Sequence, residues 1–234
     1  MTIAMRAGVA AIAAVALGIG LSACSSGNSG EDADAASPET TAQNAPADTP
    51  GAAPSPTPAA GPGITLAQYV EENGITETPV LRGDPGAPTI NLPFPQGWEA
   101  AGPRGPEGAY DALIFTADPA AQTPPTIVAF VTKLTGDVDP AKVIEYAPNE
   151  TRNLPGFQGP DSGEPSSLGG FDATQIGGFY TKDGLNHMVA QKTVVIPGQD
   201  GLFVLKLTAD GTEDLAYPLM EATAAIDEQT TITP

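Results

Sequence analysis

Few side chains in this sequence have the types and spacing that covalent or acid–base chemistry requires. The 234 residues contain one cysteine, Cys24, and one histidine, His187. No serine lies in a G-x-S-x-G elbow, and no G-x-x-x-x-G-K-[ST] phosphate loop occurs. The single histidine has no second histidine with which to bind a metal ion. Carboxylates are plentiful, but the sequence alone cannot pair two of them across a cleft. A glycoside hydrolase is therefore disfavoured but not excluded. We therefore expect no catalytic residue, no bound metal and no cofactor.

The residues that precede Cys24 indicate a covalent modification of its thiol rather than a catalytic role. Residues 1–21 carry a single charge, Arg6, ahead of an apolar run that is typical of an export signal and too short for the roughly 20 residues that span a bilayer. The stretch Leu21-Ser22-Ala23-Cys24 resembles the bacterial lipobox, where the thiol takes up diacylglycerol and the signal is cut just before the cysteine. A buried free thiol or half of an intermolecular disulfide is the alternative. We predict a signal peptide over 1–23 and a membrane anchor of diacylglycerol and palmitate on Cys24.

Charge and composition define the segment that follows the cysteine. The formal net charge is −19, which argues against nucleic acid and anionic lipid headgroups as direct partners. Residues 24–62 are rich in Pro, Ala, Ser, Thr and acids, with no aromatic side chain, so they cannot bury enough surface to offset the entropy of ordering. We predict a disordered tether that spans roughly 30 to 40 Å on average. Sugars on Ser or Thr beside its prolines are a further hypothesis.

Residues 63–234 form one domain of ordinary size. Leu66, Tyr69 and Val70 recur at helical spacing and Gly74 marks the stop of a first helix. Strands are predicted next over 89–95, 111–118 and 126–134, the last apolar on both faces between Ile127 and Val131, as in a central strand covered on two sides.

A second helix is predicted after Asp139, which caps it, with Pro140 in its first position. A metal-binding pair of Asp137 and Asp139 is the alternative, although further oxygen ligands are missing. Three strands follow as a meander with a hairpin at Asp183-Gly184, and Gly169-Gly170 and Gly177-Gly178 predict bends, bulges or a close approach to a ligand. A last helix carries the apolar stripe Leu215, Leu219, Ala222 and Ile226. The predicted fold class is α+β, an antiparallel sheet with helices packed on both faces.

Longer motifs carry a specific resemblance. The stretches ETPVLRGDPGAPTINLPFPQGW (77–98), PPTIVAFVTKLTGDVDPAKV (124–143), NLPGFQG (153–159), AQKTVVIP (190–197) and the ending AIDEQTTITP are similar to the LpqN/LpqT family of mycobacterial lipoproteins. The resemblance covers essentially the whole domain. It implies a fold like Mog1 and PsbP, an α/β/α sandwich around an antiparallel sheet. It also implies an envelope lipoprotein without assigned enzymatic activity, which binds trehalose-based mycolate glycolipids near the large membrane transporters that export them.

A glycolipid site requires an apolar slot for alkyl chains and aromatic faces or amides for the sugar. We expect Trp98 to contribute first, because it follows Pro95-Gln96-Gly97 at the end of a strand, where large aromatics are commonly half exposed. Core packing is the alternative for every candidate. The preferred candidates are Trp98, Tyr110, Tyr146, Tyr180 and Met188, and the wider set adds Phe115, Phe130, Phe157, Phe171 and Phe179.

Two functional hypotheses follow. The first is a carrier that binds a trehalose mycolate, is anchored through Cys24 at the outer face of the cytoplasmic membrane or in a periplasm-like space, and works beside a large membrane lipid transporter. The second is a protein-docking module of the envelope with no small ligand. A sizeable apolar cavity favours the carrier, and an exposed apolar patch over a solid core favours docking.

Overall fold

The structure is a computed structural model, and it describes residues 63–234. The predicted signal peptide (1–23), the predicted acylation site Cys24 and the predicted tether (24–62) lie outside the described residues. The helices are α1 (Leu66–Glu72), α2 (Pro140–Tyr146), α3 (Pro148–Arg152) and α4 (Ala216–Gln229), with 3-10 turns at Gly102–Arg104 and Glu213–Leu215. The strands are β1 (Thr76–Val80), β2 (Thr89–Asn91), β3 (Trp98–Ala100), β4 (Asp111–Phe115), β5 (Thr126–Thr135), β6 (Glu164–Leu168), β7 (Phe171–Lys182), β8 (Leu185–Gly198), β9 (Gly201–Thr212) and β10 (Thr231–Thr233).

One antiparallel sheet organises the domain. Its strand order is β3-β4-β5-β9-β8-β7-β6, and β1 pairs with the end of β5. The three longest strands, β7, β8 and β9, are joined by consecutive hairpins, which confirms the predicted meander. Asp183 and Gly184 both have positive φ, the backbone that a two-residue hairpin of type I′ requires.

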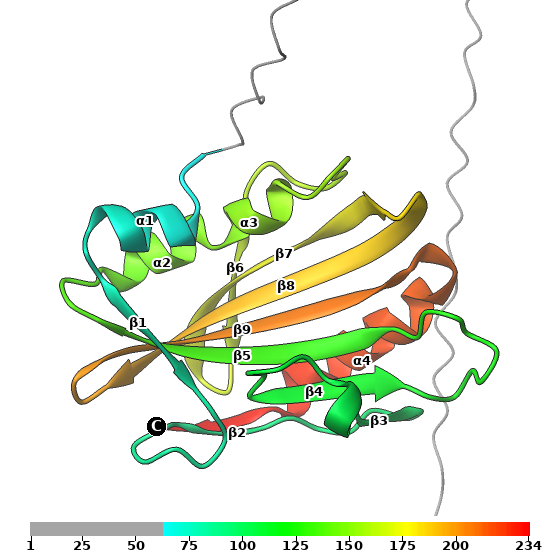
Figure 1. Cartoon of the computed structure of the whole chain (residues 1–234), viewed down its shortest axis with the longest axis horizontal. Coiled ribbons are helices and arrows are strands. Elements are labelled where there is room, and N and C mark those ends of the chain that lie inside the picture. Colours follow the sequence, from blue (N-terminus) through cyan, green and yellow to red (C-terminus); the bar gives the residue numbers. More distant parts are fainter. Residues whose placement is uncertain (1–62) are drawn as a thin grey trace, which may run out of the picture. The chain divides into compact units, whose positions relative to one another are not determined.

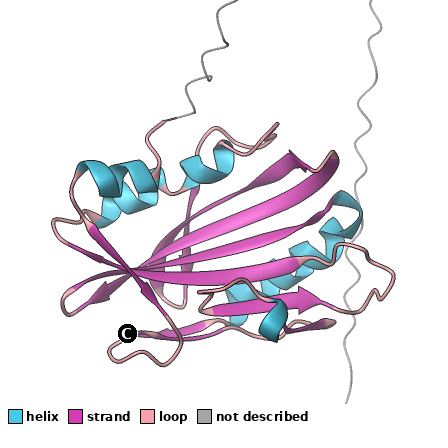
Figure 2. Cartoon of the chain, in the orientation of Figure 1, coloured by secondary structure: helices cyan, strands magenta, loops and turns pink. Residues whose placement is uncertain are grey.

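Side chains alternate along the central strands and so build two cores. Val195 on β8 and Val204 on β9 pack with Tyr69, Val70 and Val143 from the first two helices. The intervening residues of the same strands pack on the opposite face against α4. Figure 1 and Figure 2 show α1, α2 and α3 grouped on one side of the sheet and α4 on the other. The predicted α+β class, with helices on both faces of an antiparallel sheet, is confirmed.

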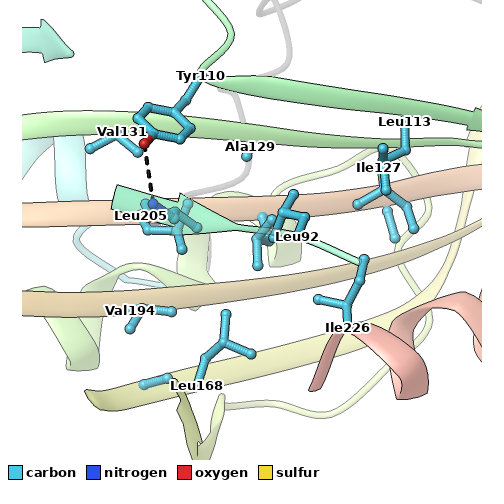
Figure 3. Packing of buried hydrophobic residues seen from close by; sticks show 14 of the residues in the cluster. Leu92, Tyr110, Leu113, Ile127, Ala129, Val131, Leu168, Val194, Leu205 and Ile226 are labelled. Carbon is cyan, nitrogen blue, oxygen red and sulfur yellow. Dashed lines mark hydrogen bonds between the residues drawn. The ribbon is translucent and has the colours of Figure 1, made fainter. Parts of the chain in front are cut away.

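The α4 face holds the larger core. Leu219, Ala222 and Ile226 of the predicted stripe are buried against the sheet. Pro218 lies in the first turn of α4, where a missing backbone N–H costs no helical bond. The short β2–β10 ribbon packs on the same core. Tyr110 is fixed to the segment that enters this ribbon, because its hydroxyl donates to the Pro88 carbonyl (2.8 Å) and accepts from the Ile90 N–H (3.2 Å). Figure 3 shows Tyr110 and Ile226 among other side chains of this core.

The paired glycines behave differently from the prediction. Gly169 and Gly170, both with positive φ, form the turn between β7 and a strand that the sequence did not predict, β6. Gly177-Gly178 does allow a close approach, but the approaching group belongs to the same chain: a Cβ on Gly178 would lie 2.5 Å from the Gln158 carbonyl oxygen. Gln158 pairs there with Phe179 as an isolated bridge. The ligand alternative for Gly178 is therefore wrong.

Two strand predictions need correction. The 89–95 segment is a strand only over Thr89–Asn91, because the prolines that follow lack ladder donors. β5 is central, as predicted, but it is not covered equally on both sides. Ile127 and Val131 are buried against the α4 core, whereas Val128 and Phe130 are only half-buried, since the first three helices extend over one end of the sheet.

Within residues 63–234, no helix has both the length and the apolar character needed to cross a bilayer.

The cap of α2 gives a direct test of the local fold. Asp139 Oδ1 accepts a hydrogen bond from the Ala141 N–H at 2.9 Å. We expect Asp139→Ala to lower the free energy of unfolding by about 1 kcal/mol, measured by urea denaturation. The exposed Asp137 is the matched control, and Asp137→Ala should change stability by less than about 0.5 kcal/mol. Equal losses from both substitutions would contradict the capping role.

Candidate functional site

A pocket of about 420 Å³ lies between α4 and the sheet. We call it the α4 pocket. Its floor comes from β5, β7, β8 and β9, and one wall comes from α4. The lining residues are Ile127, Pro160, Glu164, Gln175, Ile176, Gly177, Ala190, Gln191, Lys192, Leu207, Ala209, Thr223, Ile226 and Asp227.

Small side chains make this pocket hollow. Gly177 on β7 pairs directly with Ala190 on β8, and Ala190 pairs with Ala209 on β9. Three adjacent strands thus contribute no side chain larger than a methyl group along one row of the sheet. Ile127 of β5 pairs with Ala209 and closes the row at its far end. The row leaves an apolar trough beneath α4.

Polar groups gather beside the trough. Lys192 pairs with Gln175 across β7 and β8, and its Nζ lies 2.5 Å from Asp227 Oδ1 on α4. The lysine side chain is only 9% exposed, whereas the Asp227 side chain is 43% exposed, so the ion pair stands at the edge of the pocket. Gln175 Oε1 accepts a hydrogen bond from the Ser166 hydroxyl at 3.1 Å. Two carboxylates, the Gln175 amide, the Lys192 ammonium and the Thr223 hydroxyl thus belong to residues that line the pocket.

A second pocket, of about 440 Å³, lies on the opposite face of the sheet. We call it the Phe130 groove. Phe130, Leu134 and Val204 form its apolar floor, and α1 and the start of α3 form one side. The lining residues are Leu66, Ala67, Glu77, Pro79, Glu107, Gly108, Phe130, Val131, Thr132, Leu134, Ala147, Glu150, Gln191, Thr193, Val204 and Lys206.

Several polar groups of the Phe130 groove are bonded within the chain. Buried Gln191 donates to the Ala147 carbonyl (3.2 Å) and accepts from the Thr151 hydroxyl (3.0 Å), which fixes α3 to the sheet. Lys206 Nζ lies 3.1 Å from Glu150 Oε2. The Lys206–Glu150 pair also joins β9 to α3.

The lone histidine belongs to a buried cluster at the far end of the same face. Tyr180 donates its hydroxyl proton to Asp210 Oδ2 at 2.5 Å, and His187 Nδ1 lies 3.1 Å from Asp210 Oδ1. Burial, together with the bond to the Asp210 carboxylate, raises the pKa of Tyr180 well above its usual value. Lys182 Nζ is 3.7 Å from Asp210. The cluster joins the three strands β7, β8 and β9 through side-chain bonds.

Comparison with known proteins shows the family to which the chain belongs. The sequence pattern of the family described as "Probable lipoprotein LpqN" matches residues 62–233. This chain belongs to the LpqN lipoprotein family. It is 53% identical over 170 residues to "Lipoprotein LpqN" of Mycobacterium tuberculosis, across 73% of this chain and 74% of that relative. It is 30% identical over 134 residues to "Putative lipoprotein LpqT" of Mycobacterium leprae, across 57% and 58% of the two chains.

A solved structure of an LpqN protein shares the fold. The chain is similar to the "Crystal structure of LpqN involved in cell envelope biogenesis of Mycobacterium tuberculosis", with a TM-score of 0.70 and 52% sequence identity. The match covers 74% of this chain and 100% of the other. The predicted resemblance to the LpqN/LpqT family is therefore confirmed.

The five aromatic and methionine candidates are distributed over both faces. Trp98, only 5% exposed, packs on Phe115 with ring centroids 5.6 Å apart, and Tyr110 lies under the β2–β10 ribbon. Met188 packs against the α4 core as well. Tyr146 and Tyr180 lie on the other face, the first beside Tyr69 and the second bonded to Asp210. The fold does not bring the five together, and none lines either pocket.

The pocket residues that sequence reasoning missed are mostly small or charged. Ala190 and Ala209 have no chemical signature of their own, and only strand register reveals that they lie side by side with Gly177. Lys192 and Asp227 are 35 positions apart in sequence. Of the aromatic candidates, Phe130 alone lines a pocket described here. Within residues 63–234 no group of three or more His, Cys, Asp or Glu side chains could hold a metal ion.

The Tyr180 hydroxyl gives a test of the buried cluster. The folded state holds this proton more tightly than the unfolded chain does, so its stabilising contribution is present below about pH 10 and is lost as the pH rises toward the folded-state pKa. Tyr180→Phe should cost about 1 kcal/mol at pH 7 in urea denaturation, and the difference from the native chain should shrink above pH 10. A difference that stays constant to pH 11 would contradict this linkage.

Proposed function

We propose that this chain is a non-enzymatic, lipid-anchored protein of the cell envelope that binds a trehalose-based mycolate glycolipid in the α4 pocket and assists its transport. The observation that carries the proposal is the combination, in one pocket, of an apolar trough and a ring of polar groups suited to sugar hydroxyls. The relative of known structure is described as "involved in cell envelope biogenesis", and both curated relatives are named lipoproteins.

The trough suits an alkyl chain. Its floor is the row Gly177, Ala190 and Ala209, flanked by Ile127 and Leu207. A methylene chain laid along this row would replace water with aliphatic contacts, and each buried methylene contributes about 0.8 kcal/mol. The pocket volume of about 420 Å³ lies within the range of roughly 300 to 1,000 Å³ of small-molecule sites. One alkyl chain or a part of one fits this size better than a complete mycolate, whose remaining length would lie outside.

The opening suits a polyol. Sugar hydroxyls both donate and accept hydrogen bonds, so they require partners of both kinds. Asp227 and Glu164 supply carboxylate acceptors, Lys192 supplies donors, and the Gln175 amide supplies both. The Gln175 oxygen already accepts from Ser166, which orients the amide and leaves its N–H groups toward other partners. Because the two carboxylates outnumber the single ammonium, a neutral headgroup is favoured over an anionic one.

The anchor and tether complete the proposal. Acyl chains on Cys24 would hold the chain at the outer face of the cytoplasmic membrane or in a periplasm-like space. The tether, over residues 24–62, would let the domain reach a large membrane lipid transporter and take up the glycolipid as it emerges. The family supports the lipoprotein character, and the partner is an expectation from the resemblance stated above.

Binding is favoured over catalysis because of how the titratable groups are engaged. His187 is buried and directed at Asp210, which also receives the Tyr180 hydroxyl proton. Lys192 faces Asp227 at 2.5 Å rather than a serine or a second carboxylate that it could activate. A site that only binds requires no such activation.

A ligand panel tests the proposal. The probe is dodecanoyl trehalose, compared with free trehalose and with dodecyl dimethylamine oxide, a detergent of equal chain length without sugar. The protein is the full chain with Cys24→Ser, which cannot be acylated. We expect saturable thermal stabilisation and one-to-one adducts in native mass spectrometry with the ester alone, since a ligand at 100 times its Kd adds about 2.7 kcal/mol of stability. Equal effects of the ester and the detergent would contradict glycolipid binding.

Substitutions locate the site. Ala190→Leu fills the trough and Gln175→Ala removes an amide from the opening, so each should weaken ester binding about tenfold or more, measured by titration calorimetry. Ala224→Leu, on the exposed side of α4, makes a similar change outside the pocket and should leave affinity unchanged. If the ester binds all three variants equally well, the ligand binds elsewhere on the domain.

A further inference from the structure

The Phe130 groove lies on the face of the sheet opposite to the α4 pocket, and the proposed glycolipid site makes no use of it. We propose that this groove docks a cationic amphipathic segment of another protein. The inference does not depend on glycolipid binding, because the two pockets share no strand face and only Gln191 is common to both linings.

The floor of the groove is apolar and incompletely covered. Phe130 and Thr132 of β5 and Lys206 of β9 are half-buried, because α1, α2 and α3 extend over only part of this face. The apolar strip of the groove consists of Phe130, Leu134 and Val204. Of these, Phe130 is half-buried, whereas Leu134 and Val204 belong to the core beneath the first two helices. A partner side chain such as Leu or Ile laid on this strip would gain about 1.5 to 3 kcal/mol on full burial.

The rim of the groove is acidic on three sides. Glu77 comes from β1, Glu107 from the segment before β4, and Glu150 from α3. The single cation of the rim, Lys206, is already paired with Glu150. Neither Glu77 nor Glu107 makes an ion pair with another residue of 63–234. Two uncompensated glutamates beside an apolar strip are complementary to a segment that presents apolar side chains toward the floor and Lys or Arg toward the rim.

Charge distinguishes this occupant from others. The chain's own residues 24–62 contain five acids and no Lys or Arg, so they carry the same sign as the rim. A second copy of the chain, with a formal net charge of −19, is repelled in the same way. Anionic lipid headgroups are disfavoured for that reason too. A basic segment of a different protein is the occupant that both the strip and the rim favour.

The groove also lies where the chain enters the domain. The Asn149 side chain donates to the Ile64 carbonyl at 2.7 Å and fixes the start of the described chain beside α3. Leu66 and Ala67, two residues further along, line the groove itself. The described part of the chain thus begins beside the groove.

Peptide binding tests the inference. The protein is the full chain with Cys24→Ser, and the probe is a fluorescent eight-residue peptide of alternating Leu and Lys, read by anisotropy. Peptides of alternating Ser and Lys and of alternating Leu and Glu are the controls. We expect saturable binding of the Leu/Lys peptide, at least tenfold weaker binding of both controls, and weakening by added salt.

Matched charge variants assign the site. The double substitution Glu77→Gln with Glu107→Gln should weaken binding of the Leu/Lys peptide about tenfold, because both residues line the groove. Glu71→Gln with Glu72→Gln removes the same charge from exposed positions on α1 outside the groove and should have little effect. All four glutamates are exposed, so these variants are expected to fold.

Four outcomes would overturn the inference. Equal weakening by both double variants would mean that the peptide responds to net charge alone, and equal affinity for the Ser/Lys peptide would mean that the apolar strip is unused. Displacement of the probe by a peptide of residues 50–62 would assign the groove to the chain's own tether. If sedimentation detected a dimer, and Glu77→Gln with Glu107→Gln abolished that dimer, the groove would be assigned to a second copy of the chain.

Discussion

The pairing of β8 with β9 is the constraint on which the rest of the structure depends. The two strands pair continuously from His187 with Thr212 to Gly198 with Gly201. Because side chains alternate along each strand, a register slip of one residue would exchange the two cores and remove the partners of α1, α2 and α4 at once. The Tyr180–Asp210–His187 cluster, which links β7, β8 and β9 near one end of this pairing, helps to hold that register.

This register, together with the β7–β8 and β5–β9 pairings beside it, creates both candidate sites. On one face it aligns Gly177, Ala190 and Ala209 into a trough beneath α4, and it sets Lys192 beside that trough. On the other face it aligns Val204 and Lys206 with β5 residues that the first three helices leave partly uncovered. A single domain thereby presents the α4 pocket and the Phe130 groove on opposite faces of its sheet, so the two proposed sites do not compete for the same surface.

Much of the fold could be predicted from the sequence because its signals are local. Asp139-Pro140 marks the start of α2, Asp183-Gly184 marks a hairpin, and the stripe from Leu219 to Ile226 marks α4. The candidate site could not be predicted in the same way. Trp98 and Tyr110 were expected near a ligand on account of their residue types, yet strand pairing buries both in the core. The trough arises from residues without side-chain chemistry, and its polar edge depends on Asp227 reaching Lys192 across two elements. Such contacts follow from register and helix placement, which no short motif encodes.

The most direct test of the account is an NMR titration of the isotope-labelled full chain, carrying Cys24→Ser, with dodecanoyl trehalose. The account predicts that the largest saturable changes in amide chemical shift occur at Gly177, Ala190 and Ala209 and along the side of α4 that contains Thr223, with little change around Phe130. Changes confined to the Phe130 groove, or none beyond those caused by dodecyl dimethylamine oxide, would contradict the assignment of the α4 pocket as the glycolipid site.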